Sequence, residues 1–424
     1  MSPLFPVSLV SLVSLVSLVS HSPIPILLTN MSYHNLNRLK EIIKLFLKLG
    51  TIGFGGPAAH IAMMEEEVVK RRGWLTRSHF LDLIGATNLI PGPNSTEMAI
   101  HVGYSYGGWL GLILAGVCFI LPAVLITAIF AWIYVQFGTL PQVAPFIYGI
   151  KPAIIAVILG AVWRLGKKGV KNQKLLVILL GVANLLLFGV NEIVALLLGG
   201  IIGMIWLRLS SGKEPPSNQT VSFAIASIST GAILKASAAT GVAGISVPLW
   251  QLGWFFLKVG SVLFGSGYVL VAFLEGGLVQ ENSWLTQQQL LDAIAIGQFT
   301  PGPVLSTATF IGYLIAGLPG AIVATIAIFF PSFLFVALLN PLIPRLRESK
   351  WASAFLDAVN VSSIALMGVV TVNLAITTFI QGGTIDWRAG LIAIISAILT
   401  LRFSLNSAFL VLGGAILGWL TVDS

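Results

Sequence analysis

The chain contains 424 residues, 56% of them hydrophobic and only 9% charged, with a formal net charge of +8. Soluble domains are about one quarter charged, whereas apolar runs of about 20 residues cross a bilayer, so this composition excludes an ordinary soluble domain and predicts an all-α polytopic membrane protein. The cations gather in short loops between the apolar runs, which is typical of cytoplasmic loops and does not indicate a nucleic-acid partner.

Residues 1–34 form a low-complexity tail in which Ser-Leu-Val recurs from residue 8 to residue 19. The tail lacks the basic start of a signal peptide, and serines interrupt its apolar run. Because Met31 directly precedes the first amphipathic pattern, we expect that translation starts there or that the tail is dispensable.

The first half, residues 35–209, begins with an amphipathic helix over residues 35–50. A glycine-rich motif ending in Pro57 breaks this helix, and the helix that follows is expected to end in a charged loop at residues 65–72. Thr76 should cap the next helix, which Pro91-Gly92-Pro93 breaks because two prolines exclude helix before them. Uninterrupted spans are predicted over residues 109–135, 144–163, 175–190 and 193–207.

The second half, residues 248–424, repeats this plan. About 18 of the 48 positions in residues 46–93 are identical to the residues 210 positions later, far above chance. Thr286 and Gln289 should form a capping box. Spans are predicted over residues 319–339, 355–380, 389–401 and 408–420. Residues 210–247 form a linker, whose weakly apolar part is the one candidate for an additional crossing.

The loop charges predict that the two halves have opposite orientations in the membrane. The loop containing Lys167 is the densest basic loop and should be cytoplasmic. Its counterpart around Asp386 lacks that charge, whereas the loop containing Arg345 is basic where the first half is uncharged. Swapped charges at matching positions predict an inverted-topology repeat with broken or re-entrant helices, and they place Ser424 outside.

The repeated motifs resemble those of the chromate ion transporter family, which comprises oxyanion exporters of the bacterial plasma membrane. The resemblance is carried by Phe-Leu-Lys-x-Gly, Gly-Phe-Gly-Gly-Pro, Trp-Leu-Thr and Pro-Gly-Pro-Asn-Ser-Thr, and it covers residues 36–420, as in the two-domain members. It implies a multi-pass inner-membrane protein that exports chromate by secondary active transport. It further implies alternating access, sulfate as a competitor, and energy from the membrane potential or from protons.

A tetrahedral dianion needs hydrogen-bond donors and positive potential, which helix N-termini supply through free amides and the helix dipole. Each break begins a half-helix, and inversion would bring all four starts together near the membrane midplane. The candidate substrate-binding residues in the breaks are Gly55, Gly56, Pro91, Gly92, Pro93, Asn94, Ser95, Thr96, Gly265, Pro301, Gly302, Pro303 and Ser306. The alternative is that the breaks are packing kinks without a ligand.

Matching charged residues are further candidates. Lys48 and Lys258 lie next to the glycine breaks and could bind the anion, although Lys48 also continues a solvated lysine face. The candidates for proton transfer or ion pairing are Asp82, Asp292, Glu65 and Glu275. The alternatives are helix-dipole compensation for the two aspartates and a solvated loop for Glu65.

Other functions are left open at this stage. A transporter of another anion or a small organic solute would share the fold, and so would a membrane-embedded enzyme. The five histidines are scattered, the single cysteine excludes a cysteine metal cluster, and no nucleotide-binding motif occurs, so we expect no metal, cofactor or enzymatic activity. The expected partners are chromate or sulfate and the lipid bilayer, and a homodimer is left open.

Overall fold

The computed structural model describes residues 24–138, 140, 143–209, 247–339, 349–381, 384–403 and 405–422, without the side chains of residues 24–34, 381 and 422. Several sequence predictions lie outside these residues. They concern residues 1–23, the linker up to residue 246, the Arg345 loop and Ser424.

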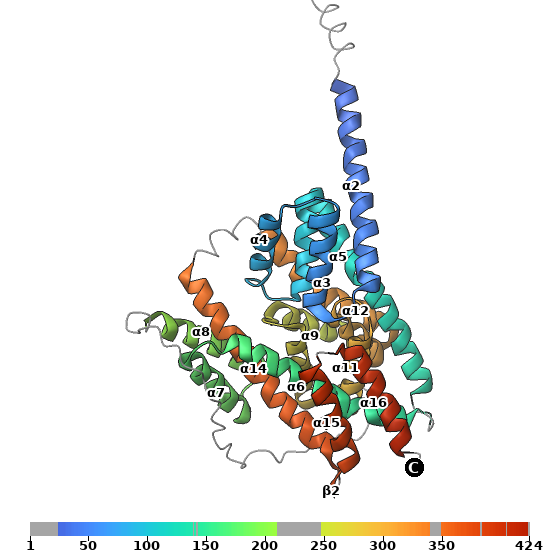
Figure 1. Cartoon of the computed structure of the whole chain (residues 1–424), viewed down its shortest axis with the longest axis vertical. Coiled ribbons are helices and arrows are strands. Elements are labelled where there is room, and N and C mark those ends of the chain that lie inside the picture. The colour runs from blue at the N-terminus through green and yellow to red at the C-terminus, as the bar shows by residue number, and fades with distance from the viewer. Residues whose placement is uncertain are drawn as a thin grey trace, which may run out of the picture.

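The first half contains eight helical elements (Figure 1). They are α2 (Ile24–Ile52), α3 (Gly56–Glu65), the π-helical turn η1 (Glu66–Arg71), α4 (Arg77–Thr87), α5 (Asn94–Phe137), α6 (Ala144–Gly169), α7 (Gln173–Leu187) and α8 (Glu192–Leu209).

The second half repeats this order with small differences. Its elements are α9 (Leu249–Val262), the 3₁₀ turn η2 (Gly267–Val269), α10 (Leu270–Leu274), the π-helical turn η3 (Glu275–Glu281), α11 (Gln287–Phe299), the 3₁₀ turn η4 (Val304–Ser306), α12 (Thr307–Leu339), α14 (Lys350–Phe379), the antiparallel strands β1 (Ile380–Gln381) and β2 (Thr384–Ile385), α15 (Trp387–Arg402) and α16 (Ser407–Val422).

The predicted helix boundaries are confirmed at both capping positions. Thr76 accepts a hydrogen bond from the His79 amide, and Thr286 forms the full capping box with Gln289. The predicted charged loop after Glu65 is wrong, because the helix continues there as η1. Lys70 pairs with Glu66 one turn earlier at 2.9 Å, which stabilises a helical path through these charges. The expected start of the first helix at residue 35 is also wrong, since α2 begins at Ile24.

In the described part of the chain, five helices are long and apolar enough to cross a membrane, namely α5, α6, α8, α12 (with η4) and α14, and α7 and α16 are shorter apolar helices. Within α5 the chain folds back at Gly108, where φ is +63°, so that Gly103 packs directly against Gly111. The counterpart in α12 is Gly317, with φ of +62°. The half-helix that begins at each proline motif therefore ends at a second glycine before a full span begins.

The two halves exchange their last helices. α7 and α8 of the first half pack on α14 of the second, and α15 and α16 of the second half pack on α6 of the first (Figure 1). α5 also packs on α12, and α6 on α14. Glycines make these contacts close: Gly149 meets Gly418 backbone to backbone, and Gly203 meets Ala358. The halves are thus interlocked rather than separate domains.

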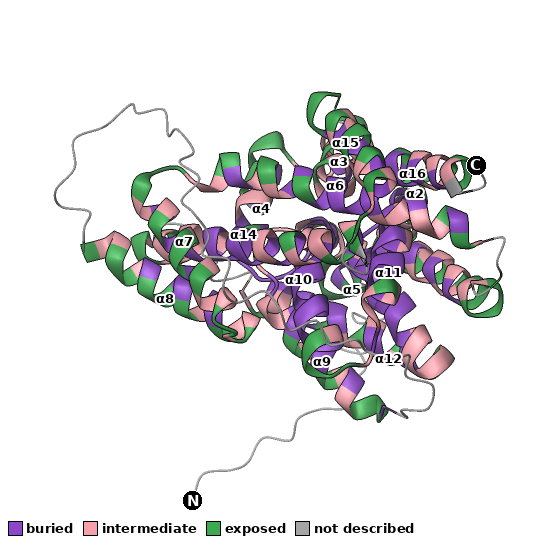
Figure 2. Ribbon diagram, turned by 90° about the horizontal axis from the view of Figure 1, so that it is seen from below, coloured by how far each residue is buried: buried purple, intermediate pink, exposed green. Residues whose placement is uncertain are grey.

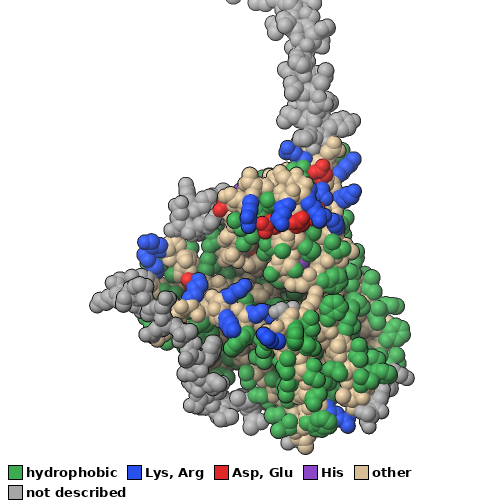
Figure 3. Space-filling view, viewed as in Figure 1, with side chains coloured by type: hydrophobic (Ala, Val, Ile, Leu, Met, Phe, Trp, Pro, Cys, Tyr) green, Lys and Arg blue, Asp and Glu red, His purple; other side chains and the backbone are tan. Residues whose placement is uncertain are grey.

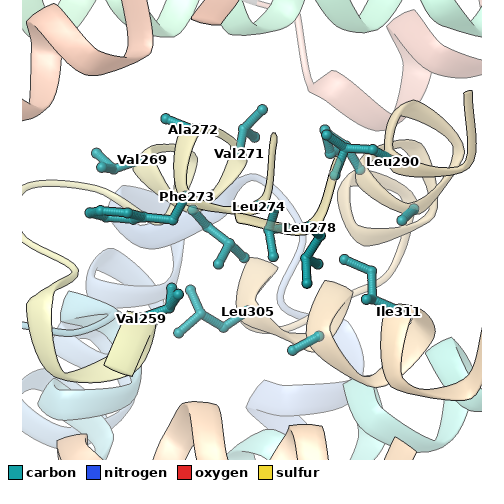
Figure 4. Packing of buried hydrophobic residues seen from close by; sticks show 14 of the residues in the cluster. Val259, Val269, Val271, Ala272, Phe273, Leu274, Leu278, Leu290, Leu305 and Ile311 are labelled. Carbon is teal, nitrogen blue, oxygen red and sulfur yellow. The ribbon is translucent and has the colours of Figure 1, made fainter. Parts of the chain in front are cut away.

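The helical hairpins that precede the proline motifs have different surroundings in the two halves. In the second half, α10 packs on α14 and α8, and α11 packs on α6 and α16. Both are largely buried (Figure 2), and Phe273, Leu278 and Leu290 of this region join one apolar cluster with Ile311 of α12 (Figure 4). In the first half, α3 packs on η1, α5 and α2, and α4 packs on α5, which leaves much of α4 exposed. The repeated sequence elements therefore have different surroundings in the two halves.

Candidate functional site: the proline-glycine breaks

The breaks of one half meet those of the other through backbone hydrogen bonds. The Gly92 amide donates to the Leu263 carbonyl at 2.7 Å, and the Gly302 amide donates to the Gly53 carbonyl at 2.7 Å. Gly302 and Leu263 lie 210 positions after Gly92 and Gly53, so the same contact is made twice. This reciprocity indicates an approximate two-fold relation between the halves, and it joins the four breaks in two cross-half pairs.

Glycine is required at the centre of each proline motif. The φ angle is +144° at Gly92 and +90° at Gly302, in a region that strains other residues. Because both amides already donate across the halves, neither is available to a bound anion. The prediction of free amides at the breaks is therefore wrong at these two positions.

The two proline motifs differ in what they face. A β-carbon built on Gly92 would overlap the Glu97 carboxylate and would lie 2.6 Å from Ser332 Oγ. One built on Gly302 would lie 2.9 Å from the β-carbon of Ala123. Ala123 is the repeat counterpart of Ser332, 209 positions earlier. The nearest atoms to the central glycine are therefore polar at the first break, and the nearest atom is apolar at the second.

Several buried polar atoms around the first break have no hydrogen-bond partner among the described residues. They are Thr96 Oγ1, both carboxylate oxygens of Glu97 and Ser332 Oγ, and all three side chains are fully buried. Ser306 Oγ has the same property, and it belongs to η4, which packs against α5. Buried polar groups in native proteins nearly always have partners, so this group of atoms marks a place for water, a proton or a ligand.

Glu97 was missed by the sequence analysis, which ended one residue short at Thr96. The signal was present, because an ionisable residue inside a long apolar stretch is expected to be functional. Glu97 is the fourth residue of α5, and Pro93 is the N-cap residue of α5, which has no side-chain cap. Its carboxylate therefore lies beside the half-helix start at which the anion was predicted.

The other predicted break residues are placed as follows. Ser95 is buried. The side-chain amide of Asn94 donates a hydrogen bond to Asn88 Oδ1 at 2.8 Å, so one of its donors is already used. Gly55, the N-cap residue of α3, has a left-handed backbone conformation and provides no side-chain cap. At the start of η2, the Ser266 side chain is the cap. A β-carbon built on Gly265 would lie 3.1 Å from Asn360 Oδ1.

His60 joins the first break from α3. Its Nε2 lies 2.9 Å from the Gly53 carbonyl, which is the acceptor of the Gly302 amide. Because a carbonyl only accepts, this contact requires the proton on Nε2. The ring also packs edge-on against Phe119. His60 therefore stabilises the cross-half contact.

The two matching lysines lie on outer faces of their helices. Lys48 pairs with Glu67 at 2.7 Å, and its hydrogen bond lowers the pKa of Glu67 below its ordinary value. Lys258 is exposed on α9 on the same face as Trp250 and Trp254. Tryptophan and lysine on one exposed face are typical of the membrane interface. The structure thus does not bring either lysine to the proline motifs.

The matching acids differ in burial. Asp82 is exposed, whereas its counterpart Asp292 is 4% exposed and accepts a hydrogen bond from Tyr134 at 2.7 Å. Glu65 pairs with Arg77 at 3.5 Å, whereas Glu275 is buried and accepts from Gln280. In each pair the second-half acid is the buried one, because the second hairpin is enclosed.

A second functional candidate, Lys151 on α6, was also missed. Lys151 is half-buried, and its positive charge is attracted by the carboxylate of Asp292. It lies inside a predicted span, so the same rule on intramembrane charges would have found it. No three His, Cys, Asp or Glu side chains of the described residues come together in a way that could hold a metal ion.

The fold and these breaks define a multi-pass membrane transporter built from two homologous halves. The family model described as "Chromate transporter" matches residues 40–204 and 250–419, so the chain belongs to the chromate transporter family. It is 35% identical over 384 residues to the chromate transport protein of Cupriavidus metallidurans, which covers 90% of this chain and 92% of that protein. It is also 34% identical over 342 residues to the probable chromate transport protein of Synechococcus elongatus, over 80% of this chain and 85% of the relative. No solved structure matches the chain.

Proposed function

We propose that the chain is a secondary transporter that exports chromate across the inner membrane and binds it at the first proline motif. Membership of the family and the printed names of the relatives support the substrate. The observation that carries the site is the set of fully buried hydroxyls at the first break that have no partner in the described part of the chain.

The chemistry of the first break suits an oxyanion. Thr96 and Ser332 each offer a hydroxyl that can donate to an anionic oxygen, and Ser306 offers a third from the other half. The N-terminus of α5 adds the positive end of a helix dipole. Neutral donors and a dipole bind a dianion that must later be released, whereas a buried lysine would hold it more tightly.

The unequal surroundings of the two hairpins support alternating access. The α10–α11 hairpin is enclosed by α6, α14 and α16, whereas α4 of the matching hairpin packs chiefly on α5 and has one face exposed. In an inverted repeat, exchange of the two environments opens the site to the other side of the membrane. We expect the membrane potential or protons to drive this exchange, and sulfate to compete, because it has the same charge and shape.

The test is uptake of radiolabelled chromate into inverted vesicles, together with chromate binding by purified protein in nanodiscs. Ser332→Ala should weaken chromate affinity by about 1–3 kcal/mol, or roughly 5–150-fold. The matched control is Ser362→Ala, a fully buried serine whose hydroxyl already bonds the Ala358 carbonyl at 2.8 Å. The control should change chromate affinity less than about threefold.

Three outcomes would contradict the proposal in different ways. Equal affinity in Ser332→Ala and wild type would move the anion away from the first break. Vesicle uptake of another anion but not of chromate would make the chain a transporter of a different solute. Consumption of chromate by purified protein without net movement would indicate an enzyme.

A further inference from the structure

Glu97 is placed where its charge state decides whether an oxyanion can occupy the first break. Its side chain is 0% exposed, and a β-carbon on Gly92 would overlap its carboxylate. Neither of its oxygens has a hydrogen-bond partner among the described residues. An ionised carboxylate without partners is so costly to bury that such a group takes up a proton instead.

The elements around α5 bring few charges to Glu97. α12 and η4 contain no Asp, Glu, Lys, Arg or His. His101 follows one turn later on α5 itself, α3 contributes the buried His60, and α11 contributes Asp292, which is bonded to Tyr134. Among the described side chains, the remaining charged residues and histidines on the elements packed against α5 are Arg38, Lys40, Glu41, Lys44 and Lys48 of α2, Glu65 of α3, and Arg77, His79 and Asp82 of α4; all but Arg38 and Glu65 are exposed. Tyr313 of α12 is a further titratable group.

We propose that Glu97 is the proton-binding residue of this transporter, and that one proton binds at Glu97 with each oxyanion. The proposal rests on oxyanion binding at the first break. A protonated Glu97 has an O–H that can donate to the anion beside the hydroxyls of Thr96 and Ser332. An ionised Glu97 would place a like charge next to a dianion in a dry site and exclude it.

The charge balance remains compatible with export. A dianion that moves with one proton carries one net negative charge, and an inside-negative potential drives that charge outward. The second proline motif has Val304-Leu305-Ser306-Thr307 where the first has Asn94-Ser95-Thr96-Glu97, so it offers no second carboxyl. Each chain should therefore couple one proton, not two.

The experiment measures chromate affinity and proton uptake of the full-length protein in nanodiscs between about pH 6 and 9. Wild-type affinity should fall about tenfold per pH unit above the pH at which Glu97 ionises, because one proton is linked to binding. Glu97→Gln should bind chromate with an affinity that lacks this dependence. Above the pH at which Glu97 ionises in wild type, the variant should take up one proton fewer per anion. Chromate takes up protons itself in acid, and the Glu97→Gln data supply that correction.

The outcomes separate this proposal from the proposed function. If wild-type protein binds no chromate, the proposed function fails. If Glu97→Gln binds chromate with the wild-type pH dependence, the coupling fails alone. Loss of the pH dependence in Asp292→Asn but not in Glu97→Gln would assign the proton to Asp292 and overturn the inference.

A folding control keeps the test decisive. Glu97→Asp retains the carboxyl group one methylene away, so it should keep the tenfold dependence with a shifted midpoint. If Glu97→Gln does not fold, an unchanged midpoint in Glu97→Asp overturns the proposal. Absence of proton uptake by wild-type protein above the pH at which Glu97 ionises, with chromate fully ionised, also overturns it.

Discussion

Replacing each central glycine of the proline motifs by alanine should separate backbone strain from anion binding. Gly92 and Gly302 are repeat counterparts with positive φ angles, and each donates its amide to the other half at 2.7 Å. Alanine at either position should cost about 1–2 kcal/mol in left-handed strain, offset by about 0.4–1 kcal/mol through the unfolded chain.

The steric contributions differ between the two positions. At Gly302 the new methyl group would lie 2.9 Å from the β-carbon of Ala123, and overpacking of this kind costs about 1–3 kcal/mol. The free energy of unfolding should therefore fall by about 2–4 kcal/mol, and Ala123→Gly should restore the overpacking part. At Gly92 the methyl group would displace the Glu97 carboxylate, so chromate affinity should fall as well.

The assay combines chemical unfolding with chromate binding for Gly302→Ala, Gly92→Ala and the double variant Gly302→Ala/Ala123→Gly. We expect Gly302→Ala to lose stability and to keep chromate affinity within about threefold, while Gly92→Ala loses at least about tenfold in affinity. If both single variants lose affinity equally, the polar and apolar breaks are equivalent and the reasoning is refuted. If Ala123→Gly gives no relief, the contact with Gly302 is not the cause of the lost stability.

Three further predictions use other contacts. Tyr134→Phe removes the hydrogen-bond donor to the buried Asp292 and should lower the free energy of unfolding by about 1–3 kcal/mol in chemical unfolding, while Asp82→Asn, at the exposed counterpart, should change it by less than about 0.5 kcal/mol. Lys48→Met breaks an ion pair whose lysine side chain is 47% exposed, and Lys258→Gln replaces an exposed lysine. Chromate uptake into inverted vesicles should stay near wild type for both variants. Loss of uptake in Lys258→Gln with normal membrane insertion would show that Lys258 is needed for transport. In a Cys118→Ala background, an impermeant thiol reagent added to intact cells should label Thr384→Cys and not Lys167→Cys, and the reverse pattern would contradict the predicted orientation.

The fold was predictable where local chemistry determines it. Thr76, Thr286 and the proline motifs end or begin helices through their own hydrogen-bonding capacity, so spacing alone located them. η1 was not predictable in this way, because a run of like and opposite charges forms a loop or a helix depending on tertiary pairing. Glu67 has Lys48, Arg71 and Arg72 around it, and this arrangement exists only after α2 and η1 pack together.

The candidate site was predictable in place but not in composition. The sequence repeat predicted where the breaks lie. It gave no reason to distinguish Gly92 from Gly302, because the residues that make their surroundings different belong to other helices. Ser332 contacts Gly92, and Ala123 contacts Gly302. Each of these residues lies in the opposite half from its glycine, more than 100 positions away in the sequence. The burial of Asp292 and the exposure of Asp82 likewise follow from the enclosure of one hairpin, which no local pattern records.

The exchange of terminal helices between the halves has a consequence for biogenesis. α6 is synthesised early, but α15 and α16, which cover much of it, are synthesised long after it. The backbone contact between Gly149 and Gly418 can form only after about 270 further residues have been synthesised. The first half must therefore remain in the bilayer as an incomplete bundle during synthesis of the second. Premature termination near the C-terminus should consequently leave the early helices, as well as the late ones, open to quality-control proteolysis.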